Sequence, residues 1–220
     1  MAEKRSEPVV VIGLGRFGSS VAQELSRRGT EVLAIDSDPK LVQSLSGELT
    51  QVVAADSTDM EALQQLGVGD FYRAVVAIGT DMEASVLTTS LLTELEIEDI
   101  WAKAVSRQHG RILERMGAHH VVFPEHDMGE RIAHLVSGRV IDYIEVGKNF
   151  TMIQTHPPRE LVGEPLDEAL LREKYAVTLV AVKSPNEEFA LPSDDAVLMY
   201  GDTLVVAGKM RDVERFIDLV

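Results

Sequence analysis

The stretch Val9-Val10-Val11-Ile12-Gly13-Leu14-Gly15-Arg16-Phe17-Gly18 decides the fold of this 220-residue chain. Four β-branched residues in a row are typical of a strand that is buried on both faces. The glycines that follow have the spacing G-x-G-x-x-G, in which Gly13 permits a tight turn and Gly15 lets the backbone approach a phosphate. Gly18 lets the following helix pack closely on the strand, and the start of that helix offers free N–H groups to an anion. The stretch therefore predicts a strand, a phosphate-binding loop and a helix.

A second predicted strand, over residues 31–35, ends at Asp36. An acidic residue about 20 residues after the glycine loop is placed to accept hydrogen bonds from a ribose diol. The next residues, Ser37 and Asp38, are not basic, so a ribose 2′-phosphate has no partner and NADP is disfavoured. ATP, ADP, AMP and NAD all carry this ribose, so Asp36 does not distinguish among them.

The alternation of strand and helix continues along the first 140 residues. Further strands are predicted over residues 51–55, 74–78, 100–104 and 120–123, and helices over residues 18–28, from 39, and over 59–66, 80–95, 109–116 and 124–136. Parallel strands need crossover helices, so six alternating strands indicate a Rossmann-like, doubly wound parallel sheet. We expect a nucleotide-binding domain over residues 1–140.

The rhythm changes after Ser137-Gly138. Strand is predicted over residues 142–155, 177–182 and 204–207, a short helix over 166–174, a turn at 186–188 and a terminal helix over 210–219. We expect a small α+β domain over residues 141–220.

Composition excludes several classes of function. The 21 Lys and Arg residues against 36 Asp and Glu residues give a net charge of −15, which argues against binding to nucleic acid. The chain has no cysteine, so it has no disulfide or thiolate chemistry. No apolar run approaches the roughly 20 residues of a membrane span. We therefore expect a cytoplasmic protein without direct membrane insertion, which works at a membrane only through another protein.

Three further groups of residues are candidates for contact with a nucleotide. Arg16, inside the loop, is able to donate two hydrogen bonds to a terminal phosphate, or it is a solvated residue at a helix start. Asp56-Ser57, after the third strand, either binds an adenine edge or forms a turn and helix cap. Ala77-Ile78-Gly79 ends the fourth strand, where a ligand lies against the sheet in such folds; the alternative is that the glycine only ends the strand.

Two charged residues lie further along. Lys103, inside the fifth strand, must find an anion or reach solvent at the end of the strand. Glu125 lies in the first turn of a helix, where a negative charge is favourable in itself. It lies alternatively near nucleotide phosphates, with a cation between the like charges.

No residues for catalysis stand out. The six histidines show no zinc-site spacing, and there is no nucleophile elbow or Walker loop. An NAD-linked oxidoreductase, which stays open as an alternative, would need a proton-transfer residue that the sequence does not offer. The sequence therefore favours a protein that is not an enzyme.

The pattern as a whole resembles the RCK/KTN regulatory subunits of bacterial Ktr- and Trk-type potassium uptake systems, most closely the Ktr type. The matching segments are residues 11–18, 31–36, 76–79, 100–104 and 123–129, and the second domain fits the small C-terminal domain of the family.

The resemblance implies a cytosolic homo-oligomer, an octameric ring built from dimers, that docks on a membrane-embedded potassium channel subunit at the inner membrane. It implies that ATP favours the conducting state and ADP the inactive one. Arg16 would contact terminal phosphates, Lys103 would contact phosphate, and Glu125 would help to bind a divalent cation, Mg²⁺ or Ca²⁺. The predicted nucleotide site therefore consists of Gly13, Gly15, Arg16, Phe17, Gly18, Asp36, Ser37, Asp56, Ser57, Ala77, Ile78, Gly79, Lys103 and Glu125.

Many relatives also bind cyclic di-AMP in the C-terminal domain. The candidates here are Arg172, Tyr175, Ala176 and Val177. Asp56 departs from the asparagine of some relatives, and the Trk branch is associated with NAD(H). Arg16 favours ATP and ADP over an NAD(H)-binding, Trk-type regulator. A nucleotide sensor without a membrane partner, such as a corepressor, is a further alternative.

Overall fold

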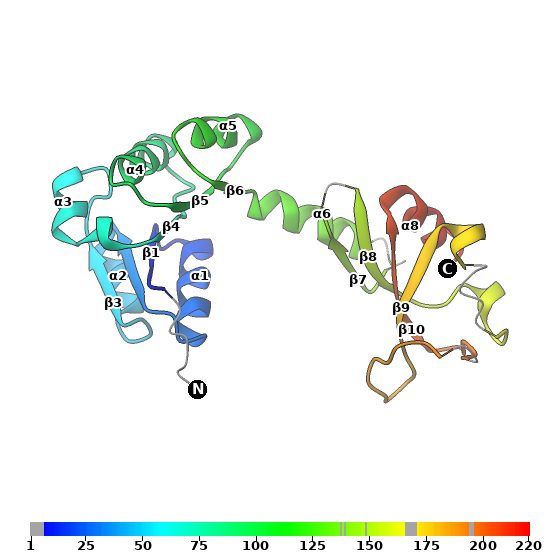
Figure 1. Ribbon diagram of the computed structural model, residues 1–220. Coiled ribbons are helices and arrows are strands. Elements are labelled where there is room, and N and C mark those ends of the chain that lie inside the picture. Colours follow the sequence, from blue (N-terminus) through cyan, green and yellow to red (C-terminus); the bar gives the residue numbers. More distant parts are fainter. Residues whose placement is uncertain (1–6, 137, 139, 148, 166–170, 194–195) are drawn as a thin grey trace. The chain divides into compact units, whose positions relative to one another are not determined.

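The computed structural model describes residues 7–136, 138, 140–147, 149–165, 171–193 and 196–220. The chain forms two compact units, residues 1–125 and 126–220 (Figure 1). The domain boundary predicted from the sequence lies at residue 140. Pro124 and Glu125 begin helix α6 (Pro124–Val136) in the first unit, and the rest of this helix belongs to the second.

The first unit is a six-stranded parallel sheet with strand order β3-β2-β1-β4-β5-β6. The predicted Rossmann-like, doubly wound sheet is thereby confirmed. Its strands are β1 (Val9–Ile12), β2 (Val32–Asp36), β3 (Gln51–Ala54), β4 (Arg73–Val76), β5 (Asp99–Lys103) and β6 (His120–Val122). Its helices are α1 (Arg16–Arg27), α2 (Pro39–Leu45), α3 (Met60–Gln65), α4 (Met82–Glu94) and α5 (Arg107–Arg115), with a 3₁₀ turn η1 (Val68–Asp70).

The helices cover the sheet in two layers because side chains alternate along each strand. Val9 and Val11 of β1 pack in one cluster with α1 and α2, and Val10 and Ile12 pack in another with α3, α4 and α5. All four residues of β1 are buried, as the apolar run predicted. Polar side chains begin the helices: Asp38, Asp59, Asp81 and Ser106 each accept a hydrogen bond from a backbone N–H in the first turn. These helix starts therefore lie where the sequence indicated, to within two residues.

The second unit contains a four-stranded antiparallel sheet with the order β7-β8-β10-β9. Its strands are β7 (Asp142–Glu145), β8 (Phe150–Thr155), β9 (Val177–Lys183) and β10 (Thr203–Lys209). Helix α8 (Met210–Ile217) packs on β8 and β10, and its Phe216 is buried in the core with Ile153 and Leu204. A 3₁₀ turn η2 (Arg159–Leu161) and a π-helical turn η3 (Leu171–Tyr175) complete the described elements.

The second unit departs from the sequence prediction at one strand, and one predicted helix lies partly outside the described residues. Residues 142–155 are two strands of a hairpin and not continuous strand, because Gly147 has φ +78° and the N–H of Val146 donates to the carbonyl of Phe150 at 2.7 Å. Of the predicted helix 166–174, residues 166–170 lie outside the described residues, and the remainder is the π-helical turn. The turn at residues 186–188 is present, with Asn186 at φ +66°.

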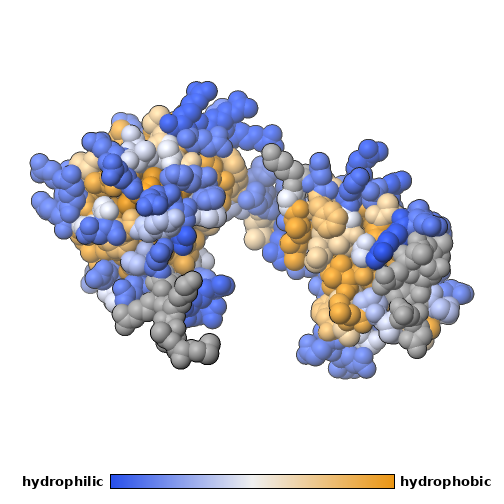
Figure 2. Space-filling model, viewed as in Figure 1, coloured by the Kyte–Doolittle hydropathy of each residue, from blue (hydrophilic) through white to orange (hydrophobic). Residues whose placement is uncertain are grey.

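On the face that Figure 2 shows, each unit mixes polar and apolar residues. Exposed apolar side chains of the second unit include Ile144, Val146 and Phe150 of the β7–β8 hairpin. None of the helices in the described part of the chain has the length and apolar character that crossing a membrane requires.

Candidate nucleotide site

A cavity of about 710 Å³ opens in the first unit at the carboxyl ends of the parallel strands. Its wall includes the last residues of three strands, Ile12 of β1, Asp36 of β2 and Lys103 of β5, and the residues directly after two strands, Gly13 after β1 and Ala77 after β4. β1 lies between β2 and β4, so the strand order reverses here, which is where ligands bind in doubly wound sheets. The volume lies within the roughly 300–1,000 Å³ of small-molecule sites.

Most residues of the predicted site line this cavity. They are Gly13, Gly15, Arg16, Phe17, Asp36, Ser37, Asp56, Ser57, Ala77, Ile78, Gly79, Lys103 and Glu125. Gly18 is not among the lining residues. Seven further residues line the cavity and were not predicted from the sequence: Ile12, Asp38, Leu41, Thr80, Asp81, Ala84 and Val105. Their position is the signal that could have found them, since Ile12 ends a strand and the other six lie between the end of a strand and the first turn of the next helix.

The glycine loop is shaped by close backbone contacts. Gly13 has φ +91°, and a Cβ there would lie 3.0 Å from the backbone nitrogen of Ile78. A Cβ on Gly18 would lie 1.8 Å from the carbonyl oxygen of Gly13. Gly15 differs, because no atom lies within 4 Å of the position of its missing Cβ. Gly13 and Gly18 therefore allow the loop to form, and Gly15 leaves the start of α1 open to the cavity.

Asp36 ties the loop to the end of β2. One carboxylate oxygen, Oδ2, accepts a hydrogen bond from the N–H of Leu14 at 2.6 Å, and Oδ1 accepts one from the N–H of Asp38 at 2.8 Å. A carboxylate oxygen has two lone pairs, so each oxygen is able to accept a further hydrogen bond from a ribose hydroxyl. Asp36 is thereby held in a fixed orientation at the cavity wall.

Asp56 and Ser57 have partners within the protein. Asp56 Oδ1 accepts hydrogen bonds from the N–H of Thr58 at 2.9 Å and from its hydroxyl at 2.7 Å, and these bonds lower the pKa of the Asp56 carboxyl. The buried Ser57 hydroxyl bonds Thr88 Oγ1 at 2.8 Å. The geometry supports the turn interpretation of Asp56, which also lines the cavity.

Lys103 and Glu125 form an ion pair at the cavity wall. Lys103 Nζ donates to Glu125 Oε1 at 2.6 Å, and the lysine side chain is 11% exposed against 63% for the glutamate. Lys103 lowers the pKa of the Glu125 carboxyl through this hydrogen bond and through its charge, to which Arg16 adds. The lysine that the sequence placed inside a strand therefore finds its anion 22 residues further along the chain.

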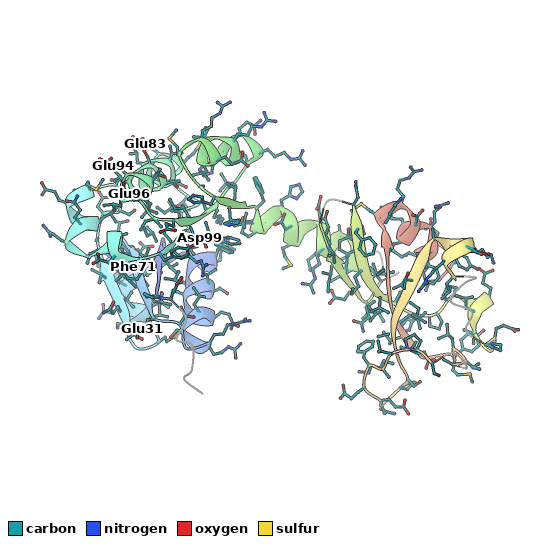
Figure 3. The ribbon with its side chains drawn as sticks, in the orientation of Figure 1. Glu31, Phe71, Glu83, Glu94, Glu96 and Asp99 are labelled. Atoms are coloured by element: carbon teal, nitrogen blue, oxygen red, sulfur yellow. The ribbon has the colours of Figure 1, made fainter. Side chains whose placement is uncertain are left out.

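The surroundings of Lys103 are compact. A Cβ on Gly79 would lie 3.0 Å from Lys103 Nζ, so the absence of a side chain at Gly79 leaves room for the ammonium group. The ring of Phe17 lies 5.8 Å from Nζ, within cation–π range. Asp99, labelled in Figure 3, begins β5 and pairs there with Arg73, at the opposite end of the strand from Lys103.

The cavity wall carries more negative than positive side chains. The acidic side chains are Asp36, Asp38, Asp56, Asp81 and Glu125, and the basic ones are Arg16 and Lys103. Among the residues that the structure describes, no three His, Asp or Glu side chains gather as a metal site. A metal ion would therefore need ligands beyond these side chains.

The four candidates for cyclic di-AMP lie at η3 and β9. The Tyr175 hydroxyl donates to Glu160, and its ring meets Phe216 edge-on, with 5.6 Å between the centroids. Ala176 has φ +56°, and Arg172 is exposed. Val177 is 2% exposed and packs in the core of the unit, so its side chain does not face a surface ligand.

Two family models cover most of the chain. Residues 9–124 match the TrkA-N domain and residues 151–220 match the TrkA-C domain. The chain is thus a two-domain protein with a TrkA-N and a TrkA-C domain, which agrees with its glycine loop and its small second unit.

Similarity to individual proteins narrows the class. The chain is 39% identical to Ktr system potassium uptake protein C of Bacillus subtilis over 207 residues, covering 94% of each chain. It is 36% identical to Ktr system potassium uptake protein A of the same organism over 98% of each chain. The chain belongs to the Ktr family of potassium uptake proteins, as its motifs predicted.

Solved structures show the same fold. The GsuK RCK domain aligns with the whole chain at a TM-score of 0.66 and 16% identity, and the GsuK channel bound to NAD aligns with 99% of the chain at 0.65 and 17%. This chain spans 49% and 40% of those two proteins. At such identities the likeness concerns the fold alone.

Proposed function

We propose that this protein is the cytoplasmic regulatory subunit of a potassium uptake system, and that it binds ATP and ADP in the cavity of its first unit. Family membership supports the role in potassium uptake. The observation that supports a nucleotide ligand is the cavity itself, which is lined by the glycine loop at the start of α1 and by the cations Arg16 and Lys103. Asp36 and Asp56 supply acceptors for a ribose and an adenine amine.

The alternative ligand is NAD(H). The GsuK channel that aligns with this chain is described as bound to NAD. NAD carries a diphosphate without a terminal phosphate, so a guanidinium at the helix start gains most from a nucleotide with a free phosphate end. Arg16 therefore favours ATP and ADP over NAD(H).

A divalent cation fits this site in the way that Mg²⁺ is held beside nucleotides. Mg²⁺ usually takes one or two carboxylates, and phosphate oxygens and water complete its shell. Glu125 pairs with Lys103 at the cavity wall and is mostly exposed, so it would supply the protein ligand. The cation would neutralise charge between the phosphates and the acidic wall.

The remaining parts of the proposal concern assembly. The partner is a membrane-embedded potassium channel subunit, on which dimers of this protein, joined in an octameric ring, would report the nucleotide state. The second unit would respond to cyclic di-AMP through Arg172 and Tyr175, both accessible from the surface. Analytical ultracentrifugation of the purified chain tests whether it forms an octamer. Isothermal titration calorimetry of the purified chain with cyclic di-AMP tests whether this ligand binds.

The decisive experiment is calorimetry of the purified chain against ATP, ADP, AMP, NAD and NADH, with and without Mg²⁺ or Ca²⁺. We expect ATP and ADP to bind more tightly than the other three. Arg16→Gln should weaken ATP more than ADP, and Arg111→Gln, an exposed arginine of α5 outside the cavity, is the matched control. Tight binding of NADH with no binding of ATP would overturn the ligand assignment. Equal losses for ATP and ADP would remove Arg16 as the discriminating group.

A further inference from the structure

The charges that line the cavity are not all available to a ligand. Lys103 is 9% exposed overall and already donates to Glu125 at 2.6 Å. A nearly buried ammonium group requires an anion, so this pair satisfies Lys103 when no phosphate is near. An incoming polyphosphate therefore meets Arg16, which forms no ion pair with any residue that the structure describes, in a wall with five carboxylates.

The two partners differ in their freedom to move. Lys103 lies at the end of a central strand, its head fitted between Gly79 and the ring of Phe17. The Glu125 side chain is 63% exposed and lies in the first turn of α6. When a third charged group competes for this pair, the glutamate is the partner that is able to leave.

We infer that Lys103 and Glu125 form an exchangeable pair, in which the phosphate tail of a nucleotide displaces the Glu125 carboxylate from the Lys103 ammonium group. This inference rests on the proposed nucleotide site and deepens it. Glu125 is thus a competitor of the ligand in the absence of a cation. The exchange also releases the first turn of α6 from β5, at the residue where the first compact unit ends.

The exchange makes an unusual prediction for a residue at a binding site. Without divalent cations, Glu125→Gln should tighten ADP and ATP binding by about tenfold, because Lys103 is then free to meet phosphate. Lys103→Met should weaken binding by at least as much. Asp127→Asn is the matched control, since it removes one charge from the same turn of α6, is 67% exposed and does not line the cavity.

Repulsion alone would also make Glu125→Gln favourable, so the double variant is needed. If the pair exchanges, Glu125→Gln should help much less in the Lys103→Met background, where there is no lysine to release. Calorimetry in EDTA measures the nucleotide affinity of wild type, Glu125→Gln, Lys103→Met and the double variant, each as the full chain. Thermal unfolding checks that each protein folds. Equal gains in both backgrounds, or no gain in the wild-type background, overturn the inference.

A second measurement is independent of affinity. In a crystal structure with ADP, the Lys103 Nζ to Glu125 Oε1 distance should lengthen beyond hydrogen-bond range, and Nζ should contact a phosphate oxygen. An intact ion pair in the complex overturns the exchange. If wild type binds none of the nucleotides, the proposed function fails, whereas nucleotide binding with an intact pair means that only the exchange fails.

Discussion

Gly15 and Gly18 belong to one motif, yet the structure gives them separate roles that substitution by alanine should separate. A Cβ on Gly18 would lie 1.8 Å from the Gly13 carbonyl oxygen and 2.9 Å from Ala77 Cβ. Carbon and oxygen approach to roughly 3.3 Å even in a weak hydrogen bond, so α1 and the loop must part by about 1.5 Å. Overpacking costs about 1–3 kcal/mol, and more where backbone must move. We therefore expect Gly18→Ala to lower the free energy of unfolding by about 3 kcal/mol.

Gly15→Ala should behave in the opposite way. Its φ of −62° suits alanine, and no atom stands within 4 Å of the new methyl group. At the position before a helix, alanine is worse than glycine by at most about 1 kcal/mol. The methyl group would, however, occupy the space through which a phosphate approaches the backbone, so ADP affinity should fall at least about tenfold.

The assay for both variants is urea unfolding followed by fluorescence of Trp101, the single tryptophan, which lies in β5 of the first unit. Calorimetry with ADP supplies the affinities. The reasoning is refuted if Gly18→Ala is as stable as wild type, since the carbonyl of Gly13 would then yield freely. It is also refuted if Gly15→Ala binds ADP as wild type does.

Three further predictions concern stability. Ser57→Ala removes the buried hydrogen bond to Thr88 and should lower the free energy of unfolding by about 1 kcal/mol, whereas the exposed Ser46→Ala should not. Burial lowers the pKa of His109, so the unfolded chain binds a proton that the folded chain does not. The free energy of unfolding should therefore fall as the pH drops below about 6.5. In urea titrations at pH 7 and 5, the difference in the free energy of unfolding between the two pH values should be smaller for His109→Gln than for wild type. Phe216→Ala leaves a cavity in the core of the second unit and should lower the free energy of unfolding by about 3–5 kcal/mol, which denaturation followed by circular dichroism measures.

The fold of the first unit was predictable because its signals are local. An apolar run such as Val9–Ile12 has one favourable environment, a buried parallel strand, and the glycine loop and Asp36 mark where the next elements begin and end. The second unit offered weaker signals. The hairpin around Gly147 read as continuous strand because its turn contains one glycine and no proline.

The candidate site was predictable to the extent that strand ends converge. The carboxyl ends of parallel strands meet at one edge of the sheet, and Asp36 and Lys103, which end β2 and β5, both line the cavity there. The partners of these residues were not predictable. The bond from Leu14 to Asp36 and the pair of Ser57 with Thr88 join residues 22 and 31 positions apart, and such contacts depend on packing that no local pattern records.

The ion pair shows why this difference matters for function. The family resemblance implied that Lys103 contacts phosphate and that Glu125 helps to bind a cation, as two separate ligands that both favour binding. In the structure, Lys103 Nζ and Glu125 Oε1 form a hydrogen bond of 2.6 Å. This bond must break before either side chain contacts the ligand. A cation that takes Glu125 then aids binding twice, because it screens the phosphates and frees Lys103. Nucleotide affinity should consequently rise more steeply with the concentration of divalent cations in wild type than in Glu125→Gln. Nucleotide titrations of both proteins over a range of Mg²⁺ concentrations measure this dependence. An equal dependence in the two proteins would mean that Glu125 takes no part in the cation effect.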